Sequence, residues 1–368
     1  MNNQVGLQEY RGDKLRLARL VKGYSLEEVG SILDVTRQNI YKMEAGQEPT
    51  TSQIQPLCEY LGIEKNFLYA ERNTPVVEEQ CHFRSLRSRT KTLTNTVMAR
   101  AELLDSLIQE MEIYFELPGF QLPISTDFDH YSLENIERAA EELRRKWELG
   151  TGPISDMTIV VENAGIIVST VDGVDEKVDA FSLARKRPII IRNNAKSSPC
   201  RYRFDLAHEL GHLVMHDGII TGCKATEKQA NYFASSFLMP RLGFFSAVES
   251  FPLVRGAKSL NWRNLEKLKK YFKVSFKAIL YRAKSLGILA EEQMRSGYIY
   301  INKKGWAKDE LLDDEIPVET PLLLDSMITS IDGARWQKIL GKLGLTNELL
   351  IELLPNIQVP RKPLSLVI

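Results

Sequence analysis

Cysteine is scarce in this sequence and long apolar runs are missing from it. The four cysteines, Cys58, Cys81, Cys200 and Cys223, lie far apart and form no CxxC pair. This spacing excludes a disulfide framework and a structural zinc knuckle built from cysteine pairs. No apolar run approaches the roughly 18 residues that span a bilayer, and the first residues lack the apolar segment of a secretory signal. We therefore expect a cytoplasmic protein that does not enter a membrane.

A net charge is also missing, because 48 Lys and Arg residues balance 48 Asp and Glu residues. The overall charge therefore gives no indication of a nucleic-acid partner. Two local stretches nevertheless contain basic and no acidic residues, one from Cys81 to Arg100 and one from Ala180 to Phe204. Each is open to two interpretations, a solvated face or an anion-binding surface, for which single-stranded DNA is a candidate activator.

The apolar residues of the chain recur mostly at the spacing typical of amphipathic helices. Its 368 residues are enough for two or three domains. Short apolar runs bounded by turn residues predict strands between the helices. We expect helices at about 88–116, 132–148, 156–163, 199–216, 226–238 and 259–289, and strands at about 165–170, 180–183, 188–192 and 298–302.

Two short helices with a tight break between them follow Ser25. Ser25 and Glu28 have the spacing of a capping box, Thr36 is suited to cap the next helix, and Gly46 is suited to end it. Two helices separated by so short a break form a helix-turn-helix. Residues 14 to 63 resemble the Xre-type DNA-binding domain of phage repressors. This resemblance implies that the second helix presents four polar side chains to a major groove, Arg37, Gln38, Asn39 and Lys42.

A second interpretation of this domain is a protein contact with a similar domain on a repressor. Residues 1–50 hold seven basic and seven acidic residues. The electrostatic footprint expected of a DNA-binding face is therefore weak. Both DNA and protein remain candidate partners of the domain.

The segment His208-Glu-Leu-Gly-His212 gives the strongest chemical signal. Histidines four residues apart lie on one face of a helix, about 6 Å apart along its axis, which suits two imidazoles that bind one tetrahedral Zn²⁺. Glu209 is placed to act on a water molecule as a general base without binding the metal. Apolar neighbours predict a buried helix, and three of the five histidines fall within nine residues. This clustering favours a metal site over two histidines satisfied inside a core.

A zinc site of this type needs a third protein ligand and one open position. His216 lies about 9 Å along the helix axis from the midpoint of the pair, so we interpret it as a packing or surface histidine. Asp217 follows the helix too closely to fold back. Glu227, on the next helix, is the preferred ligand, although the helix dipole alone also favours a glutamate there. Asn231, four residues later, is suited to fix a ligand imidazole by a hydrogen bond.

The run from Arg203 to His216, with Glu227-Lys-Gln-Ala-Asn-Tyr-Phe-Ala and Leu238-Met-Pro after it, resembles the ImmA/IrrE family of metallopeptidases. The resemblance covers roughly residues 80 to 290. It implies that the two HExxH histidines and Glu227 bind the metal and that Glu209 is catalytic. It also implies that the substrate is a helix-turn-helix repressor, encoded nearby, whose cleavage switches on stress, phage-defence or mobile-element genes.

Together these signals predict an α+β fold that is mostly helical. An all-α helix-turn-helix domain (1–70) precedes a linker and helical region (71–130). A gluzincin-like metallopeptidase domain with a small sheet and a helical extension follows (131–290), and then a small C-terminal region with no assigned role (291–368). The oligomeric state is left open.

Cys81, ahead of the peptidase segment, has two interpretations. It is either an inhibitory ligand at the open zinc position or a buried small hydrophobe. We expect His82 beside it to be structural. Tyr202, Arg203 and Tyr232 are candidates for stabilising an oxyanion.

Two functions are compatible with these features. The main hypothesis is a zinc-dependent endopeptidase that cleaves a transcriptional repressor. The alternative is a DNA-binding regulator that uses the metallopeptidase fold as a sensor. The intact HExxH motif with Glu227 favours the first, because a sensor does not need Glu209.

Overall fold

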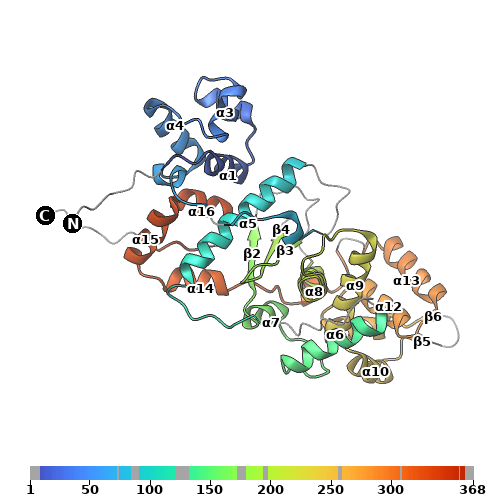
Figure 1. The fold of residues 1–368 in the computed structure, drawn as a ribbon. Helices are drawn as coiled ribbons and strands as arrows, with labels where there is room; N and C mark the ends of the chain where they lie inside the picture. Colours follow the sequence, from blue (N-terminus) through green and yellow to red (C-terminus); the bar gives the residue numbers. More distant parts are fainter. Residues whose placement is uncertain are drawn as a thin grey trace.

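The structure is a computed structural model that describes residues 9–72, 74–83, 91–120, 132–171, 180–193, 198–255, 259–306, 309–355 and 357–360. Its fold is α+β and mostly helical, as predicted. The helix-turn-helix domain lies at one end, a small sheet lies in the middle, and a group of helices extends away on the other side (Figure 1). Two hydrophobic cores hold these parts together, one on each face of the sheet.

The N-terminal domain consists of short helices packed around α1 (Gly12–Lys22). They are α2 (Leu26–Ile32), α3 (Arg37–Glu44), α4 (Thr51–Leu61) and the 3-10 turn η1 (Lys65–Leu68). The capping box is confirmed, because Ser25 Oγ accepts from Glu28 N at 3.1 Å and the Glu28 carboxylate accepts from Ser25 N at 2.7 Å. Thr36 caps α3 in a similar way. Local hydrogen bonds to otherwise unpaired N–H groups thus determine where α2 and α3 begin.

The sheet has the strand order β1-β3-β4-β2, with β1 (Cys81–Phe83), β2 (Ile167–Val171), β3 (Ala180–Leu183) and β4 (Ile189–Asn193). β2 and β4 are parallel, and β3 is antiparallel to both β4 and β1. Side chains alternate between the two faces. Ile191 joins the core that contains α5 (Lys91–Met111), whereas Ile190 joins the core around α8 (Pro199–Met215). The three strands predicted before α8 are confirmed.

Helices that surround α8 build the second core, and α9 (Lys224–Leu238) packs along it. The other members are α6 (Leu133–Lys146), α7 (Met157–Asn163), α10 (Arg241–Ser250), α11 (Trp262–Phe272), α12 (Phe276–Ser285), α13 (Glu291–Lys303) and the paired strands β5 (Val254–Arg255) and β6 (Ser259–Leu260). Gly211 allows α8 and α9 to approach closely, because a Cβ there would lie 3.0 Å from the Phe233 ring. This approach brings side chains of the two helices together.

The strand predicted at 298–302 is wrong, because these residues belong to α13. An alternation of Tyr and Ile over so few residues does not distinguish a strand from a helix. Gly297 and Ile301, four residues apart, are both buried, and a Cβ on Gly297 would lie 2.5 Å from Leu280 Cδ1. Packing against α12 therefore overrides the local strand propensity.

The C-terminal helices pack against the helix-turn-helix domain. They are α14 (Leu323–Ser330), α15 (Gly333–Leu343) and α16 (Asn347–Leu353), and they follow the turn η3 (Asp313–Glu315). Glu64 N donates to Gly344 O at 2.9 Å, and Thr346 Oγ1 donates to Gly62 O at 2.8 Å. The first hydrophobic core thus contains described residues of the helix-turn-helix domain, of α5 and of the C-terminal helices, across the predicted domain boundaries.

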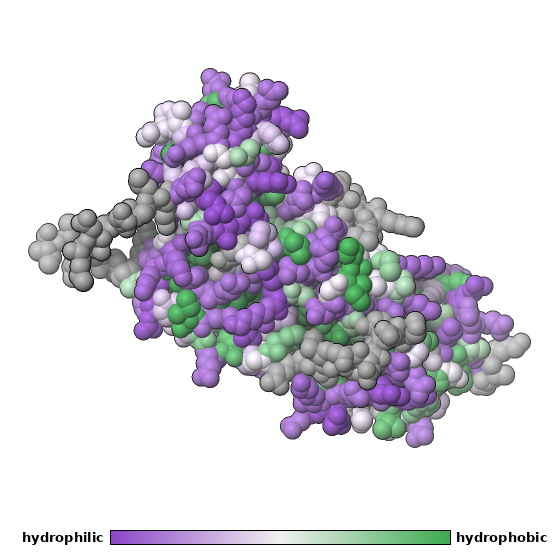
Figure 2. Space-filling model, viewed as in Figure 1, coloured by the Kyte–Doolittle hydropathy of each residue, from purple (hydrophilic) through white to green (hydrophobic). Residues whose placement is uncertain are grey.

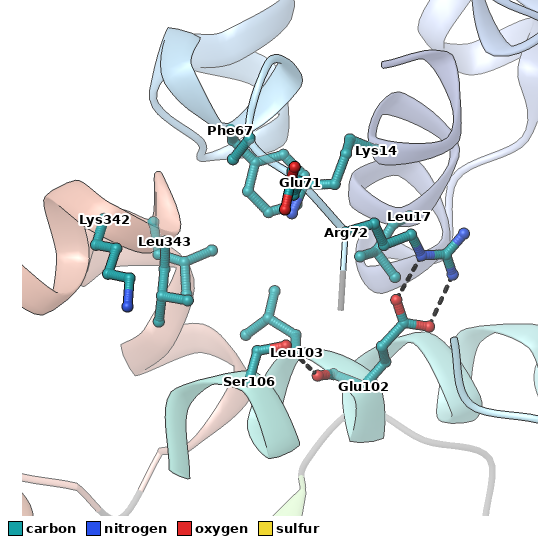
Figure 3. A pocket seen from close by; sticks show the side chains of 12 residues that line it. Lys14, Leu17, Phe67, Glu71, Arg72, Glu102, Leu103, Ser106, Lys342 and Leu343 are labelled. Atoms are coloured by element: carbon teal, nitrogen blue, oxygen red, sulfur yellow. Dashed lines mark hydrogen bonds and ion pairs between the residues drawn. The ribbon is translucent and has the colours of Figure 1, made fainter. Parts of the chain in front are cut away.

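A segment connects the helix-turn-helix domain to the turn η2 (Glu78–Gln80). The first residues of this segment pack against neighbouring helices. Figure 3 shows it beside a small cavity of about 40 Å³ between α1, α5 and α15. Arg72 donates to both carboxylate oxygens of Glu102, at 2.6 and 2.7 Å. Lys14 Nζ lies 3.9 Å from the centre of the Phe67 ring, and burial lowers the pKa of Lys14 to about 8. The Arg72–Glu102 pair joins the end of the helix-turn-helix domain to α5, whereas the Lys14–Phe67 contact lies within that domain.

Most of the described basic side chains between Ala180 and Phe204 lie close to carboxylates of the same chain. Four of its cations lie within ion-pair distance of a carboxylate in the described chain, namely Arg185, Arg187, Arg192 and Arg203. Lys196 and residues 84–90 of the other stretch lie outside the described residues. The described cations therefore favour a structural role over an anion-binding surface.

The face shown in Figure 2 is mostly hydrophilic over the helix-turn-helix domain, with separate apolar side chains over the middle of the molecule. None of the helices in the described ranges has both the length and the apolar character needed to cross a bilayer.

Candidate metal centre

α8 brings the two HExxH histidines to one buried position. Ser198 Oγ accepts a hydrogen bond from Arg201 N at 3.4 Å, and Pro199 is the first residue of the helix, so both the cap and the proline favour a helix that begins here. One turn apart on this helix, His208 and His212 have their Nε2 atoms 3.1 Å from each other. Both side chains are fully buried.

Glu227 completes a triad with this pair. Its two carboxylate oxygens lie 3.4 Å from His208 Nε2 and 3.4 Å from His212 Nε2. Ligand atoms about 2.0–2.1 Å from a tetrahedral zinc are roughly 3.3 Å from one another, so the three spacings fit one ion. Two imidazoles and a carboxylate also suit zinc better than calcium or magnesium, which prefer oxygen ligands.

Hydrogen bonds at the other ring nitrogens determine which atoms face the triad. His208 Nδ1 lies 3.1 Å from Asn231 Oδ1, an acceptor, so Nδ1 carries the proton and Nε2 presents a lone pair. His212 Nδ1 lies 2.9 Å from His216 Nδ1, and His216 Nε2 lies 2.9 Å from Gln229 Oε1. Because the amide oxygen accepts from His216 Nε2, His216 Nδ1 accepts from His212 Nδ1, and His212 Nε2 also presents a lone pair. Two lone pairs and a carboxylate therefore converge, as a cation site requires.

His216 and Gln229 extend the candidate site, and the sequence interpretation missed both. His216 is not at the surface, because it is buried and lies within hydrogen-bond distance of His212. Burial and the charge of His212 lower the pKa of His216 to about 4, so it is neutral near pH 7 and able to accept a hydrogen bond. The available signal was its spacing of four residues from His212, which places both on one helix face.

His216→Ala is expected to weaken zinc binding about 10- to 100-fold, because the His212 ring loses the acceptor that orients it. Gln229→Leu is expected to cause a smaller loss in the same direction, because it releases His216 without removing it. Competition with a fluorescent zinc chelator measures both affinities. An unchanged affinity in His216→Ala would mean that packing alone orients the ring.

Glu209 is held from the sheet side of α8. Ser182 Oγ, on β3, donates to Glu209 Oε2 at 2.8 Å, and both side chains are fully buried. This hydrogen bond fixes the orientation of the Glu209 carboxylate. Ser182 lies in a strand that the sequence predicts, but no motif marks its hydroxyl group.

β1 directs His82, and not Cys81, toward the metal helix. The His82 ring stacks on the His212 ring with centroids 5.4 Å apart, and His82 Nδ1 lies 3.3 Å from Thr221 Oγ1. Cys81 faces the other side of the sheet, where it is buried in the first core. Its position is therefore that of a small hydrophobe and not that of an inhibitory zinc ligand.

The three side chains suggested for an oxyanion have other contacts. Arg203 is fully buried and forms an ion pair with Glu319. The Tyr202 ring lies 3.8 Å below the Arg192 guanidinium, and Tyr232 belongs to the second core. These contacts give the three residues structural roles.

Solvent reaches the triad from the side of Glu227. The Glu227 side chain is 17% exposed, whereas both imidazoles are 0% exposed. Glu227 Oε1 makes no hydrogen bond to the part of the chain that the structure describes. A carboxylate oxygen without a hydrogen-bond donor, next to the lone pairs of two imidazoles, is placed to bind a cation.

α3 presents the side chains that the sequence assigns to DNA recognition. Arg37, Gln38, Asn39 and Lys42 are all exposed. Ile40 and Met43, on the other side of the helix, are buried. α3 thus offers one polar face to a groove or to a partner protein.

Comparison with known proteins matches two parts of the chain. Residues 161–284 match the family described as IrrE N-terminal-like domain, and residues 15–68 match a helix-turn-helix family. None of the curated proteins matches the chain. A solved structure of a Mycobacterium tuberculosis transcriptional regulator is similar at 17% identity and a TM-score of 0.31, over 48% of this chain and 51% of that chain. The chain thus covers about half the length of that regulator.

Proposed function

The chain has the ImmA/IrrE architecture, a helix-turn-helix domain followed by an IrrE-like peptidase domain, and from this premise we propose that it is a zinc-dependent endopeptidase. Its substrate would be a transcriptional repressor of the helix-turn-helix type, encoded by a neighbouring gene. Cleavage of that repressor would switch on stress, phage-defence or mobile-element genes.

One observation supports this proposal above the others. The Nε2 lone pairs of His208 and His212 and the carboxylate of Glu227 converge with spacings of 3.1 to 3.4 Å. Glu209 follows the first of these histidines on α8. The constellation combines a cation site with a carboxylate suited to general-base catalysis, which is what peptide hydrolysis needs.

The residues of the chain have distinct tasks in the proposed reaction. A zinc ion held by the triad would supply Lewis-acid chemistry, lowering the pKa of a water molecule and polarising the scissile carbonyl. Glu209 removes a proton from the attacking water and returns it to the leaving amine. Ser182 orients the Glu209 carboxylate, and Asn231 and His216 fix the ligand imidazoles.

An extended segment of the substrate can align with β1. This strand lies at an edge of the described sheet and directs His82 toward α8. Pairing with an edge strand uses main-chain hydrogen bonds, which hold a peptide in register whatever its sequence. Sequence selection would then depend on side-chain pockets near the triad.

Removal of the metal tests the proposal. The zinc-loaded protein is incubated with the product of the neighbouring repressor gene, and mass spectrometry locates the cleaved bond. We expect cleavage to stop when a chelator removes the zinc and to resume when zinc is added back. Persistent inactivity of the zinc-loaded protein toward each co-encoded repressor, with and without DNA, would contradict the proposal.

A DNA-binding regulator with a sensor role is the second candidate function. The exposed polar face of α3 supports it, as do the C-terminal helices that connect the helix-turn-helix domain to the core on one face of the sheet. Such a connection is able to transmit a change at the sheet to the DNA-binding domain. The two functions differ in whether regulation in cells requires the Glu209 carboxylate.

A further inference from the structure

A cleft of about 520 Å³ opens beside the triad. Glu227 and Asn231 line the cleft and also belong to the metal centre, so the cleft begins at the metal-binding position. Its volume is within the range of pockets that bind specific ligands. The side chains that line it come from α8, α9, α12 and α13, with Ser275 at the start of α12.

The cleft has an aromatic wall. Phe204 from α8, Tyr281 from α12 and Tyr298 from α13 line it, and each of the three is partly exposed. The Tyr298 hydroxyl donates to Lys277 O at 3.3 Å, which holds this ring against α12. Partly exposed rings around a cavity favour a ligand with a large apolar or aromatic side chain.

The rim of the cleft is cationic. Lys224 and Lys228 lie one turn apart on α9, and Lys277 lies on α12. None of these three ammonium groups forms an ion pair within the described part of the chain. Among the described residues that line the cleft, Glu227 is the only acidic one, and it contacts the two imidazoles. The positive potential at the rim is therefore available to attract carboxylates of a ligand.

We propose that this cleft selects the substrate, and that its occupant is a peptide segment in which a large apolar or aromatic side chain is flanked by acidic residues. The inference rests on the proposed function, because the occupant lies beside Glu227, where the scissile bond would be placed. The rings contact the apolar side chain, and the lysines attract the acidic flank. A segment that lacks both features binds weakly even when its backbone pairs with β1.

Four fluorescein-labelled decapeptides test this proposal on the zinc-loaded full-length protein. They are identical except for a central Phe or Ala and for two flanking Asp or Lys residues. Fluorescence anisotropy measures binding, and mass spectrometry measures cleavage. We expect the Phe peptide with Asp flanks to bind at least tenfold more tightly than the Ala peptide with Lys flanks, and we expect high salt to reduce the effect of the flanks.

Charge reversal at the rim gives a matched pair of variants. Lys228→Glu is expected to weaken binding of the Phe peptide with Asp flanks about fivefold and to improve binding of the same peptide with Lys flanks. Lys338→Glu, at an exposed position on α15, makes the same change of charge away from the cleft and is expected to bind every peptide as the wild type does.

The outcomes separate this inference from the proposed function. Selective binding without cleavage of any peptide supports the subsite, and the repressor assay above then decides separately whether the protein is a peptidase. Cleavage that depends neither on the central residue and flanks nor on Lys228 supports the peptidase and overturns the subsite. A protein that binds none of the four peptides overturns the subsite, and inactivity toward the co-encoded repressors as well would overturn the peptidase.

Discussion

Glu209→Gln is expected to lower the rate of repressor cleavage about a thousandfold while zinc remains bound. The amide has nearly the shape of the carboxylate and can still accept the hydrogen bond from Ser182 Oγ, which is 2.8 Å long in the wild type. The variant loses the capacity to take a proton from water, and general acid–base catalysis contributes about 10²–10⁴-fold to a rate. The three side chains of the triad are unchanged, so the affinity for zinc is expected to be retained.

Metal analysis and single-turnover cleavage of the repressor check this expectation together. Glu292→Gln makes the same chemical change at an exposed position on α13 and is expected to cleave at the wild-type rate. Equal cleavage by Glu209→Gln and the wild type would exclude Glu209 as the base. Identical regulation by the two proteins in cells would favour the sensor function.

Local helix geometry explains which parts of the centre could be predicted. The spacing of four residues places His208 and His212 on one helix face, and the same spacing does so for Glu227 and Asn231. That the two helices face each other is tertiary information, and it depends on the close approach at Gly211. The Ser182 contact with Glu209 joins residues 27 positions apart through the packing of a sheet on a helix, so no local pattern predicts it.

For the fold as well, local sequence patterns predicted individual elements but not the contacts between distant parts of the chain. Short apolar runs between turns were sufficient for β2, β3 and β4, because burial on both faces of a sheet leaves such runs in the sequence. The prediction of a strand at Tyr298-Ile-Tyr-Ile was wrong because packing against α12 stabilises a helix there. The docking of α14, α15 and α16 on the helix-turn-helix domain could not be predicted, since an apolar helix face does not identify the surface that covers it.

Arg282→Met is expected to destabilise the protein by about 3–5 kcal/mol, because it leaves a buried carboxylate without its cation. Arg282 is fully buried on α12 and donates to both oxygens of Glu137 on α6, at 2.7 and 2.5 Å. It also donates to Met239 O at 2.8 Å, which follows the helix that carries Glu227. Urea unfolding followed by tryptophan fluorescence measures the loss of unfolding free energy. Arg138→Met is the control, at an exposed position next to Glu137, and its unfolding free energy is expected to stay within about 0.5 kcal/mol of the wild-type value.

The pH dependence of this loss follows from the state of Glu137. Burial raises its pKa, but hydrogen bonds and charge from Arg282 outweigh burial and hold the pKa below its ordinary value of 4.5. The ion pair therefore stabilises the wild type above about pH 4.5, and this stabilisation is lost as the pH falls through the lowered pKa. In Arg282→Met the carboxyl group is buried alone, its pKa rises, and acid removes its charge. The difference in unfolding free energy between the two proteins is therefore expected to narrow as the pH falls, first through the raised pKa of the variant and then through the lowered pKa of the wild type.

The double variant Glu137→Leu/Arg282→Met separates the two sources of the loss. If the unpaired carboxylate dominates, replacing both charges by apolar side chains recovers most of the stability, because a buried ion pair contributes little beyond well-packed hydrophobic residues. If the double variant is as unstable as Arg282→Met, the loss comes instead from the hydrogen bonds of Arg282 to Met239 O and Ser236 Oγ, which the double variant also lacks. The second result would make Arg282 a clamp on the end of α9, and zinc affinity should then fall together with stability.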